Sequence, residues 1–367
     1  MSFSTILHDA EAGQPLSRDG LVVLLAARTD AECAALHNAA YRVKQREVGA
    51  VARMRGLVEV SNTCVKNCLY CGIRSGNTEL PRFRLARREV MDLAALAHEF
   101  RYGSVVLQAG ERQDPAWVGF IEDAVRRIKA QSNNALGVTL SLGEQTRETY
   151  RRWFAAGAHR YLLRIETSSP TLYAQLHPKK YHAWQTRAAC LDELAAGGWQ
   201  VGTGVMCGLP GQTLDDLAGD ILFFREKNAD MLGMGPWIPH SGTPLGREHQ
   251  AAFDAAAALR LGLNMIAVAR LALRDVNIAS TTALQALAPD GRERGLLAGA
   301  NVLMPNLTPA ERRAGYQLYD NKPFLDENAR ATRAALEASV HAIGETIARD
   351  DWGDSPHFAA RTRAGNK

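Results

Sequence analysis

The sequence predicts a closed parallel (βα)8 TIM barrel with helical additions at both ends, and two observations support this prediction. Eight short apolar runs alternate with longer stretches of helical periodicity, which is typical of a parallel sheet covered by helices. The 367 residues are 46% apolar, so the chain can bury one barrel of about 250 residues with terminal additions. An open doubly wound sheet would leave a similar pattern, and this alternative stays open.

The chain divides into three expected parts. We expect a helical lead-in at 1–54, the barrel at 55–305, and a helical cap packed on the barrel at 306–367. The barrel strands are expected at 57–62, 104–110, 137–143, 160–166, 200–206, 230–236, 276–282 and 300–305.

Helix start signals mark several of the intervening and flanking segments. In the lead-in, helical periodicity covers about 16–54, with Asp19 and Thr29 expected to cap its helices. Within the barrel, Thr213 is expected to start a helix through a capping box. In the C-terminal cap, a long helical pattern is expected to run through Ile347.

Charge and composition narrow the function classes. The net charge of +4 is small for this length, and the dispersed Lys and Arg residues argue against nucleic acid as a partner. The N-terminus lacks the basic and apolar regions of a signal peptide, and no uninterrupted apolar run has membrane-spanning length. We therefore expect a cytoplasmic protein without membrane association. Three isolated cysteines, Cys33, Cys190 and Cys207, suit a reducing compartment.

The remaining cysteines form a single loop directly after the first strand. Cys64, Cys68 and Cys71 follow the spacing Cys-x3-Cys-x2-Cys, and three thiolates so close can converge on one iron-sulfur cluster. No fourth cysteine is near, so one iron would stay open for chemistry. A structural zinc site is the weaker alternative, because it needs four ligands and the nearest histidine along the chain is His98. A disulfide is weaker still, because three cysteines cannot pair evenly.

Polar residues on the strands predict a hollow, polar barrel interior. Strand alternation places Ser141 on one face of its strand, and Arg164 with Glu166 on one face of the next. Buried charges are costly unless they are paired, so we read Arg164 and Glu166 as ligand contacts, with a structural ion pair as the alternative. Gly110 and Glu111 follow the second strand, where Glu111 is a candidate ligand or a helix-start carboxylate.

The cysteine loop, with Tyr70 before its last cysteine, resembles the signature of the radical S-adenosylmethionine (SAM) superfamily. The resemblance implies one 4Fe-4S cluster on the three cysteines, with SAM bound at the open iron and cleaved reductively to a 5'-deoxyadenosyl radical. Gly110 and Glu111 resemble the superfamily's GGE motif, although Ala109 stands at its first position. The cofactor-binding residues expected on this basis are Tyr70, Gly110, Glu111, Ser141, Glu144, Arg164 and Glu166, where Glu144 would bind ribose or orient Arg164.

Further motifs resemble the HydE family of FeFe-hydrogenase maturases. They include VVLQAGE, VTLSLGE, YLLRIET, GLPGQT, GPWIPHSGTPL, ASTTA and GANVLMPNLTP, in the order of that family. The resemblance implies assembly of the hydrogenase H-cluster, on a small organometallic or amino-acid-derived substrate such as a cysteine-bound Fe(CO)2(CN) complex. It also implies contact with the maturases HydG and HydF and with an electron donor such as flavodoxin or ferredoxin. The expected substrate chamber is lined by Met206, Thr281, Thr282 and Met304.

Three alternatives to this function stay open. A radical SAM mutase of the methylornithine synthase type would share the same chemistry. Biotin synthase is disfavoured, because the second and third strands carry no cysteines for its second cluster. A non-catalytic scaffold that carries a metal complex is the alternative from another class. Some family members hold an additional cluster near the C-terminus, but 316–329 contains no cysteine here, so one cluster is expected.

Overall fold

Eight parallel strands form the centre of the fold in this computed structural model, which describes residues 1–320, 322–323 and 329–365. The sheet order is β10-β1-β2-β3-β4-β5-β7-β9, and a parallel bridge between Ala279 and Val302 joins β9 to β10. The eight strands therefore close into a ring, which confirms the predicted barrel and excludes an open sheet. Their bounds are β1 Val51–Ser61, β2 Ser104–Ala109, β3 Gly137–Ser141, β4 Arg160–Leu162, β5 Gln200–Thr203, β7 Met231–Leu232, β9 Asn277–Ile278 and β10 Val302–Leu303.

Two predicted strands are each divided in the structure. The segment 200–206 gives β5 and then β6 (Met206–Cys207), and 230–236 gives β7 and then β8 (Gly235–Pro236); β6 pairs with β8. The break follows from a close backbone approach, because a Cβ on Gly204 would lie 2.0 Å from the carbonyl oxygen of Gly233. The glycine thus allows the backbones of neighbouring strands to contact each other.

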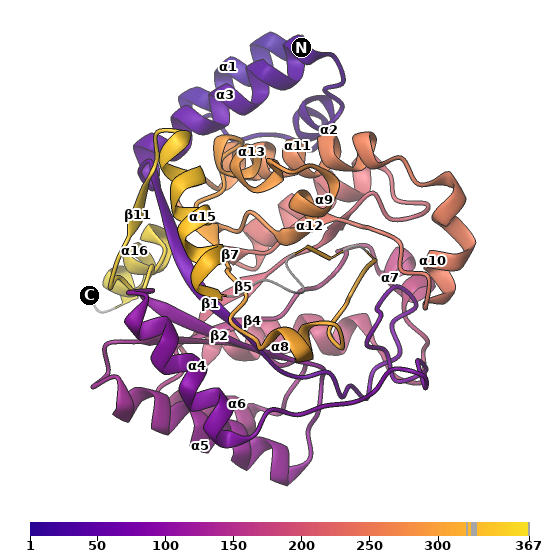
Figure 1. Cartoon of the computed structure of the whole chain (residues 1–367). Helices are drawn as coiled ribbons and strands as arrows, with labels where there is room; N and C mark the ends of the chain where they lie inside the picture. The colour runs from indigo at the N-terminus through magenta and orange to yellow at the C-terminus, as the bar shows by residue number, and fades with distance from the viewer. Residues whose placement is uncertain (321, 324–328, 366–367) are drawn as a thin grey trace.

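Helices cover the outside of the ring, as Figure 1 shows for α4, α5 and α6 below the sheet. Each buries an apolar stripe against the strands; α4, for example, buries Val90, Ala94 and Ala97. The capping box of Thr213 at the start of α9 is confirmed. The covering and connecting helices are α4 Arg87–Glu99, α5 Pro115–Gln131, α6 Arg147–Ala155, α7 Pro170–Leu176, α8 Trp184–Ala196, α9 Leu214–Glu226, α10 Pro244–His249, α11 Ala255–Leu273, α12 Thr282–Leu287 and α13 Gly291–Leu297, with a short 3-10 turn at Gln250–Ala252.

The helix α11 is apolar enough, by length and composition, to cross a membrane. It has 19 residues and a mean hydropathy of 1.5, yet 67% of that stretch is buried inside the fold. It packs against α2 (Arg18–Leu25) and α3 (Asp30–Glu47) of the N-terminal region, so it has the surroundings of a core helix.

The N-terminal region consists of α1 (Phe3–Ala12), α2 (Arg18–Leu25) and α3 (Asp30–Glu47). Thr29 and Glu32 form the expected capping box of α3. The expected cap at Asp19 is wrong, because the side chain of Ser17 caps α2 and Asp19 lies in the first turn. The helical pattern also does not reach Met54, because β1 begins at Val51, where it pairs with a C-terminal strand.

The C-terminal region contains α14 (Ala310–Arg313), α15 (Ala329–Ala342), β11 (Thr346–Ala348) and α16 (Pro356–Gly365). The predicted helix through Ile347 is wrong there, because 346–348 forms β11 in parallel pairing with β1 (Figure 1). The following segment closes the N-terminal end of the barrel. Arg55 donates to the carbonyl oxygen of Gly353 at 3.0 Å, and Arg160 donates to that of Trp352 at 2.6 Å.

Candidate active site

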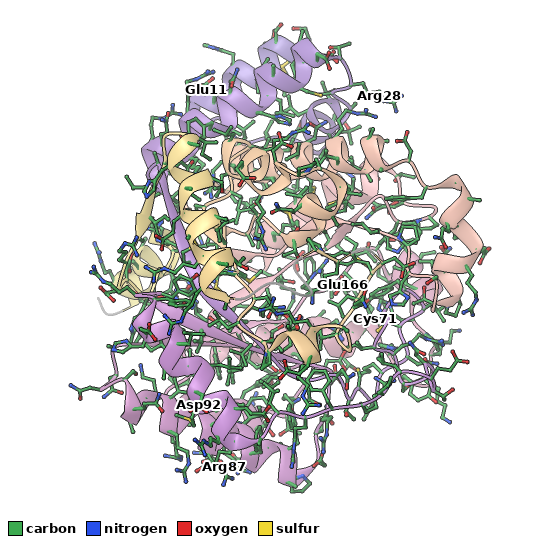
Figure 2. The ribbon with its side chains drawn as sticks, in the orientation of Figure 1. Glu11, Arg28, Cys71, Arg87, Asp92 and Glu166 are labelled. Carbon is green, nitrogen blue, oxygen red and sulfur yellow. The ribbon has the colours of Figure 1, made fainter. Side chains whose placement is uncertain are left out.

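A cavity of about 300 Å³ lies at the C-terminal ends of the barrel strands. Every site residue expected from the sequence lines this cavity, except Glu144. In Figure 2, Cys71 and Glu166 lie in the interior of the molecule, away from outer residues such as Arg87 and Asp92 on α4. The expected residues that line the cavity are Cys64, Cys68, Tyr70, Cys71, Gly110, Glu111, Ser141, Arg164, Glu166, Met206, Thr281, Thr282 and Met304.

The cysteine loop leaves the end of β1 and is held by hydrogen bonds from several sides. The backbone N–H of Val65 donates to the carbonyl oxygen of Glu111 at 3.0 Å, and that of Leu69 donates to Leu176 at 2.9 Å. The N–H of Gly72 donates to the carbonyl oxygen of Leu318 at 3.3 Å. The loop therefore has a conformation that three separate parts of the chain determine. All six cysteines lie in the described residues and none forms a disulfide.

The three thiols face a low-dielectric environment. Burial raises the pKa of the Cys68 thiol to about 12. Burial also raises the pKa of Cys64, and it raises the pKa of Cys71 well above its ordinary value. Three partly buried thiols ionise together only if positive charge compensates them, and the iron of an iron-sulfur cluster would provide that charge.

Gly110 is required by the cysteine loop itself. A Cβ at this position would lie 2.4 Å from the carbonyl oxygen of Thr63 and 2.7 Å from Cβ of Cys64. The N–H of Gly110 also donates to the carbonyl oxygen of Ser61 at 3.0 Å. The glycine thus allows β2 to end directly beside the first cysteine, which brings Glu111 next to the loop; the N–H of Glu111 donates to Sγ of Cys64 at 3.3 Å.

Four buried charges form a network beneath the cysteine loop. Glu111 lies 3.3 Å from Nζ of Lys66 and 3.5 Å from Nη2 of Arg187. Glu144 lies 2.8 Å from Lys66 and 2.9 Å from Nε of Arg187. Burial raises the pKa of Glu111, and the two cations balance the two carboxylates.

The network corrects one expectation about Glu144. This residue does not orient Arg164, because its partners are Lys66 and Arg187. It also does not line the cavity; its backbone N–H donates to the carboxylate of Glu111, which does. Arg187 lines the cavity and was missed, because a single arginine in a helical pattern gives no signal in the sequence.

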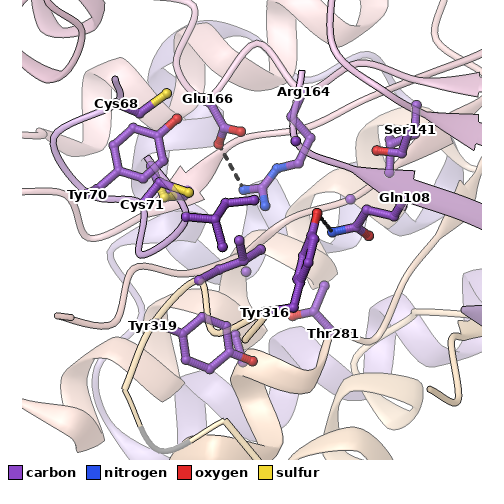
Figure 3. Close-up of a pocket in the computed structure, with 18 of the residues that line it drawn as sticks. Cys68, Tyr70, Cys71, Gln108, Ser141, Arg164, Glu166, Thr281, Tyr316 and Tyr319 are labelled. Atoms are coloured by element: carbon purple, nitrogen blue, oxygen red, sulfur yellow. Dashed lines mark hydrogen bonds and ion pairs between the residues drawn. The ribbon is translucent and has the colours of Figure 1, made fainter. Parts of the chain in front are cut away.

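Arg164 and Glu166 form an ion pair, and both side chains line the cavity (Figure 3). Nη2 of Arg164 lies 3.1 Å from Glu166 and donates to the carbonyl oxygen of Val205 at 2.8 Å. They stand beyond the end of β4, where Glu166 has a left-handed φ of 68°. Nε of Arg164 is buried and has no hydrogen-bond partner among the described residues. An anionic ligand group would satisfy it.

Other polar side chains line the cavity beside apolar ones such as Leu162, Trp237 and Ile238. Ser141 ends β3, and the hydroxyl of Tyr70 lies 3.0 Å from Nε2 of His177. The Thr281 hydroxyl is buried and makes no hydrogen bond to a described residue. The Thr282 hydroxyl instead accepts a hydrogen bond from Tyr319 at 3.0 Å.

Several cavity residues were not predicted from the sequence. Tyr316 and Tyr319 come from the C-terminal region, and Gln108 donates to the hydroxyl of Tyr316 at 3.4 Å (Figure 3). Glu59 forms a buried ion pair with Lys322. A carboxylate within the apolar run LVEVS was a usable signal for Glu59, whereas the tyrosines have no local pattern that links them to a barrel interior.

A closed (βα)8 barrel in which the first strand leads into three cysteines at a cavity defines a class of enzymes. The model of the radical SAM superfamily matches residues 58–224, and the chain belongs to that superfamily. Within it, the chain belongs with the HydE hydrogenase maturases. It is 43% identical over 320 residues to the FeFe hydrogenase maturase subunit HydE of Thermotoga maritima. The aligned residues cover 87% of this chain and 88% of that protein.

Other relatives are more distant. The 3-methylornithine synthase of Methanosarcina acetivorans is 24% identical over 328 residues, 89% of each chain. The solved structure of methylornithine synthase has a TM-score of 0.80 at 21% identity and covers 98% of this chain and 99% of that one. The maturase HydG from Carboxydothermus hydrogenoformans has a TM-score of 0.77 at 20% identity and covers 95% of this chain and 79% of that one. These two structural likenesses concern the fold.

Proposed function

We propose that this chain is a cytoplasmic hydrogenase maturase that cleaves SAM reductively and acts on a cysteine-bound Fe(CO)2(CN) precursor of the H-cluster. The observation that carries this proposal is one cavity that is lined by the cysteine loop and also by Thr281 and Met304, which follow β9 and β10. The relative that is 43% identical is itself a hydrogenase maturase subunit.

The chain's residues fit the cofactors of the superfamily. Cys64, Cys68 and Cys71 supply three thiols on one loop, and they would hold one 4Fe-4S cluster. When bound, the cluster supplies the electron that cleaves SAM. Because the sequence has no second cysteine group, one cluster is proposed.

The residues around the loop would bind SAM. The partnerless Nε of Arg164 suits a carboxylate, since a guanidinium matches two oxygens, and the neighbouring Glu166 suits an amino group or hydroxyls. Glu111, Gly110, Tyr70 and Ser141 complete this part of the wall. Glu144 would act through Arg187 and Glu111, by holding the guanidinium and carboxylate in place.

The substrate would bind on the far side of the cavity. Met206, Thr281, Thr282 and Met304 line this part, and the free Thr281 hydroxyl can donate a hydrogen bond to an anionic complex. Tyr319, which is bonded to Thr282, would keep bulk water away from the substrate.

An outside protein must reduce the cluster, and we place it at a donor face made of Val65, Lys179, Lys180 and Tyr181. Val65 is 51% exposed and Tyr181 is 37% exposed, which is unusual for large apolar side chains. Lys66, the neighbour of Val65, donates to the carbonyl oxygen of Tyr181 at 2.7 Å, so the two segments are adjacent. An apolar centre with exposed lysines suits a small acidic carrier such as flavodoxin or ferredoxin.

The maturases HydG and HydF are proposed as further partners.

The test is anaerobic and compares substrates. The reconstituted and reduced protein is given SAM with either lysine or a cysteine-bound Fe(CO)2(CN) complex, and 5'-deoxyadenosine is measured. We expect stimulation by the iron complex alone. Methylornithine formed from lysine would instead support the mutase, and Cys71→Ser with full maturation activity would support the non-catalytic scaffold.

A further inference from the structure

One group of metal-binding side chains joins Cys68 of the proposed cluster site to two histidines that have no role in that site. One ligand atom from each of Cys68, His177 and His182 lies within 4.8 Å of the other two. Nε2 of His182 is 3.7 Å from Sγ of Cys68. His177 directly follows α7, and His182 lies just before α8. Both are far from Cys68 along the chain; the separation between Cys68 and His182 is 114 residues.

The hydrogen bonds determine which ring nitrogen of each histidine carries no proton. Nδ1 of His177 lies 2.8 Å from the carbonyl oxygen of Tyr173, which can only accept, so Nδ1 carries the proton. The backbone N–H of Asn67 donates to Nε2 of His182 at 3.3 Å, so this Nε2 has no proton. Both histidines therefore have an unprotonated Nε2. Each accepts one hydrogen bond, His177 from the Tyr70 hydroxyl at 3.0 Å and His182 from Asn67, and a metal ion would replace these two donors.

The surroundings of His177 resemble those of a natural metal-binding histidine. Such a histidine usually donates its other ring N–H to a carbonyl or carboxylate, and His177 does so to Tyr173. Its ring also stacks on Tyr173 with centroids 3.8 Å apart, which fixes its orientation. His177 is 2% exposed and His182 is 8% exposed, so water competes little for these nitrogens. The cations Lys66 and Arg187 nearby are already paired with Glu111 and Glu144.

We propose that the chain without its iron-sulfur cluster binds one Zn²⁺ through Cys68, His177 and His182. Thiolate and imidazole are both ligands that zinc accepts, and three protein ligands leave the fourth position to water. Tetrahedral bonds of about 2.0–2.3 Å place ligand atoms roughly 3.3–3.8 Å apart, so the side chains need to move by only about 1 Å. Binding releases the proton of the Cys68 thiol to solvent.

The zinc site and the cluster exclude each other, because both use the sulfur of Cys68. This consequence rests on the proposed function, whereas zinc binding itself does not. Zinc would therefore slow cluster assembly until it is removed.

The test measures zinc binding by the chain stripped of metal, in competition with a chromophoric chelator. We expect one Zn²⁺ per chain in the wild type and in the double variant Cys64→Ser/Cys71→Ser, since neither changed residue is a ligand. We expect binding to weaken more than about tenfold in His177→Gln and in His182→Gln. The control His240→Gln, in which the changed histidine lies beside Gly72 of the same loop, should bind like the wild type.

Cobalt supplies a second measurement that needs no variant. The absorption of Co²⁺ added to the wild type should show a tetrahedral site with one thiolate. Three results would overturn the proposal. The first is loss of binding in the double cysteine variant with full binding in both histidine variants. The second is a cobalt spectrum of three thiolates, and the third is the absence of a tight zinc site in the wild type. Because the stripped chain is used, a failed SAM assay would leave these results unaffected.

Discussion

Nε of Arg187 lies 2.9 Å from the carboxylate of Glu144, and the same guanidinium reaches Glu111 at 3.5 Å. A residue of α8 thereby joins the ends of β2 and β3 below the cysteine loop. The side chains of Arg187, Glu111 and Glu144 are at most 10% exposed, so this contact is protected from solvent screening.

Replacement of Arg187 should destabilise the protein strongly. In Arg187→Met, two buried carboxylates would share Lys66 alone, and breaking a buried ion pair in this way costs about 3–5 kcal/mol. Chemical unfolding of the cluster-free chain measures this loss. The control Arg147→Met removes a surface arginine, 80% exposed, from its pair with Glu193 and should change stability little. Equal effects of the two changes would refute the structural role of the network.

Cys71→Ser should abolish cluster binding. The iron content after reconstitution should fall from about four per chain to near zero, because two remaining thiolates cannot hold a cubic cluster. Cys33→Ser, in which the changed cysteine lies on α3 outside the cavity, should keep its iron. An iron content of about eight in the wild type would contradict the proposal of a single cluster.

Arg164→Met should weaken SAM binding by the reconstituted protein about 10- to 100-fold. The change removes a charged donor whose Nε has no partner in the described residues, and such a hydrogen bond contributes about 1.5–3 kcal/mol. Equilibrium binding of SAM measures the effect. Arg112→Met is the matched control, because Arg112 pairs with Asp114 outside the cavity. Unchanged SAM affinity with a lower melting temperature would leave Arg164 and Glu166 as a structural pair.

His159 should make the protein less stable as the pH falls. Burial, followed by the charge of Arg160, lowers the pKa of His159 to about 4, below its ordinary 6.5. Between these two pH values, the unfolded chain binds a proton at His159 more readily than the folded chain does. The contribution of neutral His159 to the free energy of unfolding is therefore complete above pH 6.5 and is lost as the pH falls toward 4. The loss is about 3 kcal/mol. Urea unfolding from pH 7 to pH 4 should show a steeper decline for the wild type than for His159→Gln; parallel curves would contradict the assignment.

Charge reversal at the donor face should slow enzymatic reduction of the cluster. In Lys179→Glu/Lys180→Glu, the rate of reduction by an acidic flavodoxin should fall at least about tenfold at low salt and depend less on ionic strength. Reduction by dithionite should be unchanged, since this small reagent needs no docking surface. The pair Arg126→Glu/Arg127→Glu on α5 reverses the same number of charges elsewhere. Equal slowing by both pairs would argue against a specific face.

The sequence by itself determined the barrel, the cysteine loop and a part of the cavity wall. Strand alternation and helical periodicity are local properties, and the C-terminal ends of parallel strands meet at one rim, so residues such as Glu111, Arg164 and Thr281 are brought together by topology alone. Short-range capping was equally readable at Thr29 and Thr213, because the partner lies three residues away.

Only the tertiary structure decided which of these residues contact one another. Glu144 pairs with Arg187 and not with Arg164, because α8 delivers a competing guanidinium that no pattern in the sequence announces. The strand β11 replaces the end of a predicted helix, because the free edge of β1 offers backbone hydrogen bonds there. His177 and His182 reach Cys68 only through the packing of α7 and the segment before α8. Such contacts depend on packing between distant segments, which residue spacing does not encode.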